Sequence, residues 1–227
     1  MSNPHEGHRQ RLKERFLKTG LESFQAHEIL ELLLFYARPR IDTNEIAHAL
    51  IEKFGSLSGV FDANPEDIAS VKGMGENAAV LLKMIPQLAS AYGRSKTESE
   101  VMDGSKKICT HFFNCFIGVK NEQLRVACLD DGLKIRSEGV VIEGGVSAVP
   151  MDVRKIVEFT YRSGCEMIII AHNHPNGLPV PSETDIAMTN KLFSILNSVG
   201  IKLLDHIIVN KDKASSMYDA GYFSMFK

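Results

Sequence analysis

Apolar residues recur at helical spacing through roughly the first ninety positions of the chain. A nearly continuous apolar run covers 26–36, apolar positions three and four apart follow over 46–54, and a further helix is expected over 77–92. Asp42 and Glu45 have the spacing of a capping box at the start of the second of these helices. The pattern therefore predicts a small all-α domain over residues 1–93.

The pattern changes after a polar, charged stretch at 94–104, which is predicted to be a linker. Strands and helices then alternate. Strands are expected over 124–129, 139–142, 167–171 and 201–209, and helices over 151–162 and 183–198. This order predicts an α/β domain over 105–227, with a mixed sheet flanked by helices and enough residues to bury a core of its own.

Composition narrows the function classes only slightly. The chain has 227 residues and a formal net charge of -2, so no overall positive field would drive non-specific binding to nucleic acid. It contains no apolar run long enough to cross a membrane and no signal-peptide pattern, so a cytoplasmic protein without a membrane partner is expected. Its cysteines lack metal-type pairing, which favours reduced thiols.

The strongest chemical signal follows the strand expected at 167–171. His172 and His174 are two positions apart, so on an extended chain both imidazoles point to the same side, and Asp185 follows shortly downstream. Two imidazoles and one carboxylate form a three-ligand metal site that leaves one coordination position open. That arrangement is typical of a hydrolytic zinc centre rather than of a structural one.

Ser182 and Asp185 also have a purely structural interpretation. Ser-x-x-Asp before an apolar-periodic stretch is a good helix N-cap with an acid at the third helical position. The two interpretations are compatible, because a capped first turn would aim Asp185 back toward the histidines.

The helical region carries a second candidate motif, Gly73-x-Gly75, between two expected helices. Two glycines leave backbone amides free to contact a phosphate oxygen, and Lys72 adds a positive charge, so this loop is a candidate for DNA-backbone contact. The alternative is a tight turn that only packs two helices together. Acidic and basic residues balance across the domain, which argues against strong DNA affinity.

Over nearly its full length the chain resembles the bacterial RadC family, whose catalytic half looks like the JAMM (MPN+) metalloprotease domain of deubiquitinating enzymes. The matching segments are His172-Asn173-His174-Pro175-Asn176-Gly177, Pro181-Ser182-x-x-Asp185, Leu204-Asp205-His206-Ile207-Ile208-Val209, Phe54-Gly55-Ser56-Leu57 and Val71-Lys72-Gly73-Met74-Gly75. The resemblance implies a cytidine-deaminase-like JAMM domain preceded by a helix-hairpin-helix region. It also implies a zinc ion held by His172, His174 and Asp185.

An upstream glutamate that acts on a metal-activated water is a further implication of the resemblance. The match falls on Glu122, just before the first long strand of the domain, and Glu138 and Glu143 compete with it because they flank the next strand. Ser182 would stabilise the developing oxyanion. His206 is expected to support the site or the core rather than to bind the metal directly.

The sequence departs from the family pattern at two places, Asn176 where serine is usual and Gly144-Gly145 where Gly-Thr is usual. Neither touches an expected ligand. The chain is therefore expected to be a zinc hydrolase of peptide or protein amide bonds, and the resemblance also implies a link to DNA repair. A DNA-binding repair protein or nuclease, and a non-catalytic interaction module, are the alternatives.

Overall fold

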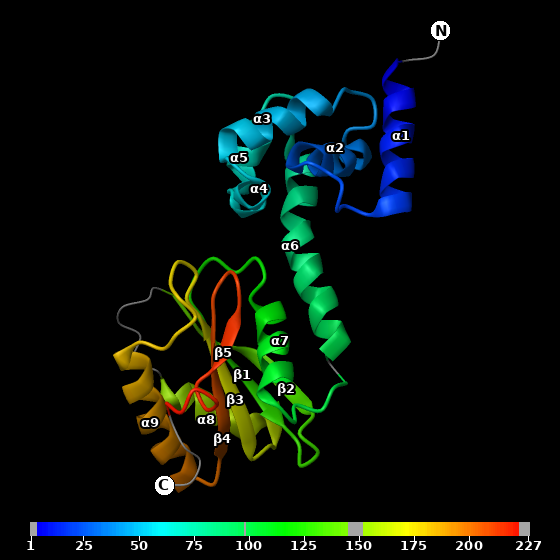
Figure 1. Cartoon of the computed structure of the whole chain (residues 1–227). Coiled ribbons are helices and arrows are strands. Elements are labelled where there is room, and N and C mark those ends of the chain that lie inside the picture. The colour runs from blue at the N-terminus through cyan, green and yellow to red at the C-terminus, as the bar shows by residue number, and fades with distance from the viewer. Residues whose placement is uncertain (1–3, 98, 145–151, 223–227) are drawn as a thin grey trace. The chain divides into compact units, whose positions relative to one another are not determined.

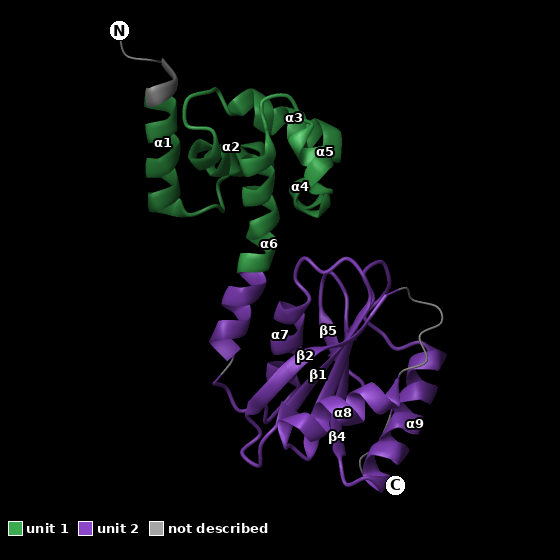
Figure 2. Cartoon of the chain, turned by 180° about the vertical axis from the view of Figure 1, so that it is seen from behind, with its two compact units in different colours: residues 1–88 green, residues 89–227 purple. Residues whose placement is uncertain are grey.

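The computed structural model describes residues 4–97, 99–144 and 152–222. The chain divides into two compact units, residues 1–88 and 89–227 (Figure 2). The first unit is helical and the second carries a mixed sheet flanked by helices, so the predicted fold class is confirmed. Among the described residues, no helix is both long and apolar enough to cross a membrane.

Unit 1 is built from short helices around one apolar core. Its elements are α1 (Pro4–Thr19), α2 (Ala26–Ala37), α3 (Asn44–Phe54), α4 (Leu57–Asp62), α5 (Pro65–Ala69) and the first part of α6 (Glu76–Thr97). Leu30 and Leu34 of α2 pack against Leu50 of α3 and Leu82 of α6, all without solvent exposure. These are the positions that the helical spacing of apolar residues predicts.

The predicted start of α3 is wrong by one residue. Thr43 is the N-cap, and its side chain makes no capping hydrogen bond. The carboxylate of Asp42 instead accepts a hydrogen bond from the backbone N–H of Asn44 at 2.9 Å, an Asx-type turn that leads into the helix. The capping box expected between Asp42 and Glu45 is therefore not formed.

Helix α6 continues to Thr97, so the segment predicted as a linker is helical at its start, and the boundary between the units lies within this helix, after Leu88. Arg94 and Lys96 in the last turn suit a helix C-terminus, where the negative end of the helix dipole favours cations. The polar residues Ser95 and Lys96 lie on exposed helix surface, and the predicted linker beyond Thr97 follows the helix.

Unit 2 is organised around a five-stranded mixed sheet (Figure 1). Its elements are α7 (Ser105–Cys115), β1 (Gln123–Leu129), β2 (Ile135–Glu143), α8 (Val153–Ser163), β3 (Met167–Asn173), α9 (Glu183–Ser198), β4 (Lys202–Val209) and β5 (Ala214–Ser216). The strand order is β2-β1-β3-β4-β5. Only β3 and β4 are parallel among these neighbouring pairs.

Helices cover both faces of the sheet. On one face, Ile156 of α8 and Leu192 of α9 pack against Val126, Ile168 and other residues of the strands. On the other face, Phe112 of α7 packs against the alternate strand positions, such as Ile169. The near-continuous apolar runs of β1 and β3 follow from this burial on both faces.

Candidate metal centre

The carboxyl end of β3 delivers the two histidines. β3 is hydrogen-bonded to β1 on one edge and to β4 on the other. The strand ends at Asn173, so His172 belongs to the end of the strand and His174 follows directly after it. The parallel pair β3 and β4 is joined through α9, a crossover that brings the first turn of α9 beside the end of β3. Asp185 lies in that first turn.

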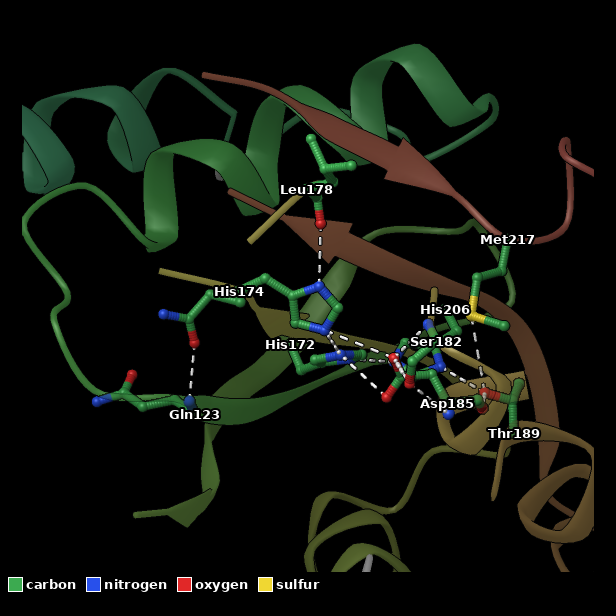
Figure 3. Close-up of polar contacts among 10 residues, drawn as sticks. Gln123, His172, His174, Leu178, Ser182, Asp185, Thr189, His206 and Met217 are labelled. Carbon is green, nitrogen blue, oxygen red and sulfur yellow. Dashed lines mark hydrogen bonds and ion pairs between the residues drawn. The ribbon is translucent and has the colours of Figure 1, made fainter. Parts of the chain in front are cut away.

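The side chains of His172, His174 and Asp185 converge on one point (Figure 3). The two Nε2 atoms are 2.8 Å apart. Asp185 Oδ1 lies 3.3 Å from Nε2 of His172, and Oδ2 lies 3.5 Å from Nε2 of His174. The three side chains are 13 to 20% exposed, so the site is partly shielded and still open to solvent.

Asp185 is held by the capping box that the sequence predicts. The Ser182 hydroxyl accepts a hydrogen bond from the backbone N–H of Asp185 at 3.2 Å, and the Asp185 carboxylate accepts one from the backbone N–H of Ser182 at 2.7 Å. The Ser182 hydroxyl also donates to Asp185 Oδ2 at 2.6 Å. The cap and the aim of Asp185 toward the histidines are thus properties of the same turn.

Electrostatics within the cluster favour a charged carboxylate. Burial alone would raise the pKa of Asp185, but hydrogen bonds to His172, His174 and Ser182 outweigh it and hold that pKa well below its usual range. The hydrogen bond to Asp185 conversely raises the pKa of His174, against the effect of burial. The cluster therefore pairs the Asp185 carboxylate with two imidazoles that can carry a positive charge.

His174 is fixed in one orientation by the turn that follows it. Its Nδ1 lies 3.0 Å from the carbonyl oxygen of Leu178, which can only accept, so Nδ1 carries a proton and the neutral ring has its lone pair on Nε2. The turn closes through a hydrogen bond from the N–H of Gly177 to the carbonyl of His174, with Pro175 at the position that proline favours. Asn176, the departure from the family pattern, is exposed in this turn.

The donor set fits a tetrahedral metal. Ligand atoms at zinc-bond length are separated by about 3.3–3.5 Å along the edges of a tetrahedron. Asp185 Oδ1 lies at that spacing from Nε2 of His172, and Oδ2 lies at that spacing from Nε2 of His174. Each carboxylate oxygen therefore matches one edge, and the 2.8 Å between the two Nε2 atoms is shorter. Two imidazole nitrogens and one carboxylate at these separations form a donor set that a divalent cation can take.

Glu122 lies at the amino end of β1, beside the histidines. Asn173, between the two histidines, is buried, and its side chain makes hydrogen bonds to the backbone on either side of Glu122. Its Oδ1 accepts from the N–H of Gln123 at 2.8 Å, and its Nδ2 donates to the carbonyl of Asn121 at 3.0 Å. Gln123 lies beside the histidines in Figure 3. Burial raises the pKa of Glu122. The nearby His174 and His172 lower it, and Asp185 raises it, so the carboxyl lies within electrostatic reach of the cluster.

The competing glutamates have other partners. Glu138 faces α7, where His111 and Cys115 contact its carboxylate. Glu143 is exposed, and its carboxylate accepts a hydrogen bond from the Gln123 side chain. Their contacts favour Glu122 as the residue that acts at the histidine cluster, which remains a prediction. Gly145 of the second departure from the family pattern lies outside the described residues.

A second group of potential ligands, His111, Cys115 and Glu138, lies among the residues that pack between α7 and the sheet. Glu138 Oε2 is 2.7 Å from His111 Nε2, and Oε1 is 2.7 Å from Nη1 of Arg125. Burial raises the pKa of Glu138, yet the hydrogen bond from His111 and the Arg125 charge lower it to about 2. Arg125 already supplies a cation to this carboxylate, so the group works as a buried ion cluster.

His206 does not reach the point where the three candidate ligand atoms meet. It is fully buried, with Nε2 2.8 Å from Nδ1 of His172 and Nδ1 2.6 Å from the hydroxyl of Thr189. Burial lowers the pKa of His206 well below its usual value. These contacts agree with a supporting position behind His172.

The candidate DNA-contact residues lie in unit 1, in the loop between α5 and α6. Gly73 and Gly75 both have positive φ, +88° and +86°, and Lys72 is exposed. A Cβ at Gly73 would lie 2.7 Å from Cδ1 of Ile46, so this glycine is required by packing. A Cβ at Gly75 would meet only Nη1 of Arg38, at 3.7 Å. The glycine loop thus agrees with both interpretations, since Gly73 is required by packing and Arg38 places a positive charge beside Gly75.

The groups that support the cluster were not predicted from the sequence. Thr189 lies one helical turn after Asp185, and this spacing was an available signal. Asn173 stands inside the histidine motif, and its role depends on the antiparallel pairing of β3 with β1, which no local pattern reveals. One sequence signal indicates the second group of potential ligands: His111 and Cys115 are four residues apart, the spacing of neighbours on one helix face. Nothing in the sequence connects them with Glu138.

Comparison with known proteins agrees with this architecture. The model of a RadC-like JAB domain matches residues 102–222, and that of a UPF0758 N-terminal region matches residues 6–80. A UPF0758 protein of Ruegeria pomeroyi is 32% identical over 216 residues, which cover 95% of this chain and 96% of that protein. The two matched regions correspond to the helical part and to the α/β part that the hydrophobic pattern separates.

Proposed function

Because the chain belongs to the RadC-like JAB family, we propose that it is a zinc-dependent hydrolase that cleaves amide or isopeptide bonds. The observation that carries this proposal is the convergence of His172, His174 and Asp185 at the end of β3, with the Glu122 carboxyl within electrostatic reach. Two nitrogens and one carboxylate suit zinc, and three protein ligands leave a position for water or substrate.

A zinc ion held by these three side chains would lower the pKa of a bound water and polarise the carbonyl of the substrate. Glu122 is the group that would take the proton of the attacking water and return it to the leaving amine. Burial keeps its pKa above that of a free glutamate, which suits a group that must both accept and release a proton.

Ser182 is proposed to stabilise the oxyanion that forms during attack. In the present arrangement its hydroxyl proton is directed to Asp185 Oδ2. A role toward the oxyanion therefore requires that this proton be redirected from Asp185 to the substrate. The hydrogen bonds from the backbone N–H groups of Ser182 and Asp185 to each other's side chains would keep the serine in place during that change.

The test is a screen of zinc-loaded protein against a peptide and isopeptide library, with two matched variants. Glu122→Gln is expected to retain one zinc per chain and to lose cleavage, and His172→Ala is expected to lose the zinc itself, as measured by elemental analysis. Glu143→Gln, on an exposed carboxylate nearby, is the control that should behave like the wild type. A fully active Glu122→Gln protein would refute the role given to Glu122.

DNA contact by unit 1 is a second proposal, and the presence of Arg38 beside Gly75 favours it. Backbone amides of the two glycines, together with Arg38 and Lys72, form a place where a phosphate oxygen could bind. Binding to a fluorescent DNA duplex should weaken with salt and fall on Lys72→Ala. DNA affinity that is independent of Lys72 and Arg38 would contradict this proposal. A nuclease is not favoured, since a single His-His-Asp site lacks the second metal and the carboxylates of many nucleases.

A further inference from the structure

The buried His206 connects a proposed zinc ligand with a helix residue. Its Nε2 lies 2.8 Å from Nδ1 of His172, and its Nδ1 lies 2.6 Å from Oγ1 of Thr189 (Figure 3). The Thr189 hydroxyl also lies 2.6 Å from the carbonyl oxygen of Asp185. Neither His206 nor Thr189 has any exposed surface, so water does not compete for these hydrogen bonds.

The number of available protons determines the direction of each bond. The Asp185 carbonyl can only accept, so the single hydroxyl proton of Thr189 is donated to it. Thr189 Oγ1 must then accept from His206, and Nδ1 of His206 carries a proton. A fully buried imidazole with no carboxylate partner is neutral, which leaves the lone pair of His206 on Nε2.

The same count fixes the tautomer of His172. Since Nε2 of His206 accepts, Nδ1 of His172 is the donor, and the lone pair of His172 lies on Nε2. That Nε2 atom is the one that lies beside His174 and Asp185. The hydrogen bonds thus form an open network that runs from His172 through His206 and Thr189 to the backbone carbonyl of Asp185.

We propose that Thr189 and His206 are positioning residues, which hold His172 in the tautomer whose Nε2 is free to bind a cation. This inference rests on the proposed zinc site. This hydrogen-bond network ties the two segments that carry ligands, the end of β3 and the first turn of α9, to one another through β4. Loss of such supporting hydrogen bonds typically lowers metal affinity about 10- to 100-fold.

Thr160 provides a matched control for a purely structural role. It is also fully buried in a helix on the same face of the sheet, and its hydroxyl donates to the carbonyl four residues earlier, that of Ile156, at 2.8 Å. Thr189→Val and Thr160→Val therefore remove the same kind of helix-internal hydrogen bond. Only the first removes the acceptor of a histidine that contacts the candidate metal site.

The experiment has a metal-free and a metal-bound part, both on the full chain. Nitrogen-15 NMR of the metal-free protein should show His172 protonated at Nδ1, and Thr189→Val should weaken that preference. Competition with a chromophoric zinc chelator should show an affinity about 10- to 100-fold lower for Thr189→Val. Thr189→Ser, which keeps the hydroxyl, should restore it, and Thr160→Val should bind as the wild type does.

Several outcomes would overturn the inference. They are a His172 protonated at Nε2 in the metal-free protein, an unchanged zinc affinity for Thr189→Val, and an equal loss for Thr160→Val. Failure of the proposed function looks different. A chain with the expected tautomer that binds no zinc, or binds it without cleaving any peptide, would refute the zinc site or the hydrolase and leave the hydrogen-bond network intact.

Discussion

Asn173 and Gln123 are joined by a 2.8 Å hydrogen bond from the backbone N–H of Gln123 to the side-chain oxygen of Asn173. The amide nitrogen of the same side chain donates to Asn121, so the backbone is held on both sides of Glu122. Asn173 is only 3% exposed and stands between the two histidines in sequence. The residue that separates the proposed ligands therefore positions the proposed base.

Asn173→Asp should separate zinc binding from hydrolysis. The aspartate can still accept the hydrogen bond from Gln123. Its second oxygen would take the place of the amide nitrogen, which in the wild type lies 3.0 Å from the carbonyl oxygen of Asn121, so two oxygens would face each other without a proton between them. Glu122 would shift, and misplacement of a catalytic group by about 1 Å lowers a rate on the order of 10²-fold. Zinc content, measured by elemental analysis, should stay at the wild-type value while peptide cleavage falls.

Asn190→Asp is the control for Asn173→Asp. The Asn190 amide donates to the carbonyl of Ile186 within α9, away from Glu122, and this variant should cleave as the wild type does. Wild-type cleavage by Asn173→Asp would show that the bonds to Asn121 and Gln123 do not position Glu122.

Ser182→Gly should distinguish the two roles of the serine. Glycine is a tolerable N-cap that costs only a few tenths of a kcal/mol relative to serine, so α9 should keep its stability. Removing an oxyanion donor typically lowers kcat about 10²- to 10³-fold. Thermal unfolding and cleavage rates of the same preparation provide the comparison. If cleavage were unchanged, Ser182 would be a helix cap alone.

The parts of the site that the sequence predicts are those set by local spacing. His172 and His174 share a side because of strand geometry, and the capping box of Ser182 and Asp185 forms within one helical turn. The meeting of the two segments follows from the crossover through α9, which the expected strand-helix-strand order already contains.

The parts that the sequence does not predict depend on pairing between distant strands. His206 reaches His172 because β4 pairs with β3 in the register that places Ile170 beside His206, after an irregularity between Ile168 and Ile169. A shift by one residue would turn His206 to the other face of the sheet. Helix α7 was also missed, although Ile108, Phe112 and Cys115 have helical spacing and are buried.

Glu138 should give the protein a specific sensitivity to acid. Its folded-state pKa is lowered to about 2 from a usual 4.5, so the stabilisation is present above pH 4.5 and is lost as the pH falls toward 2. The shift corresponds to about 3 kcal/mol. The difference in unfolding free energy between wild type and Glu138→Gln should therefore be largest near neutral pH and shrink across this window.

Urea unfolding at a series of pH values would measure that difference. Glu143→Gln removes an exposed carboxylate at the end of the same strand, so its unfolding free energy should stay within about 0.5 kcal/mol of the wild-type value at every pH. A stability difference for Glu138→Gln that did not vary between pH 7 and pH 3 would show that the ion cluster with His111 and Arg125 does not stabilise the charged carboxylate.

Gly73→Ala and Gly75→Ala should differ in cost although both glycines have φ near +87°. The left-handed conformation costs either alanine about 1–2 kcal/mol. At Gly73 the new Cβ would also lie 2.7 Å from Cδ1 of Ile46, and such overpacking adds about 1–3 kcal/mol. At Gly75 the nearest group is the flexible end of Arg38, at 3.7 Å, which adds little.

Denaturant unfolding followed by circular dichroism should therefore rank Gly73→Ala below Gly75→Ala in stability. Ile46→Val removes the Cδ1 atom that a Cβ at position 73 would strike first, so in the Gly73→Ala background it should recover part of the loss. In the wild-type background the same change should cost about 0.5–1.5 kcal/mol. An Ile46→Val substitution that destabilises the wild type but stabilises Gly73→Ala would indicate a direct contact between the two positions. Simple additivity of the two substitutions would mean that the loop can move away from α3, and that Gly73 is not fixed by packing against Ile46.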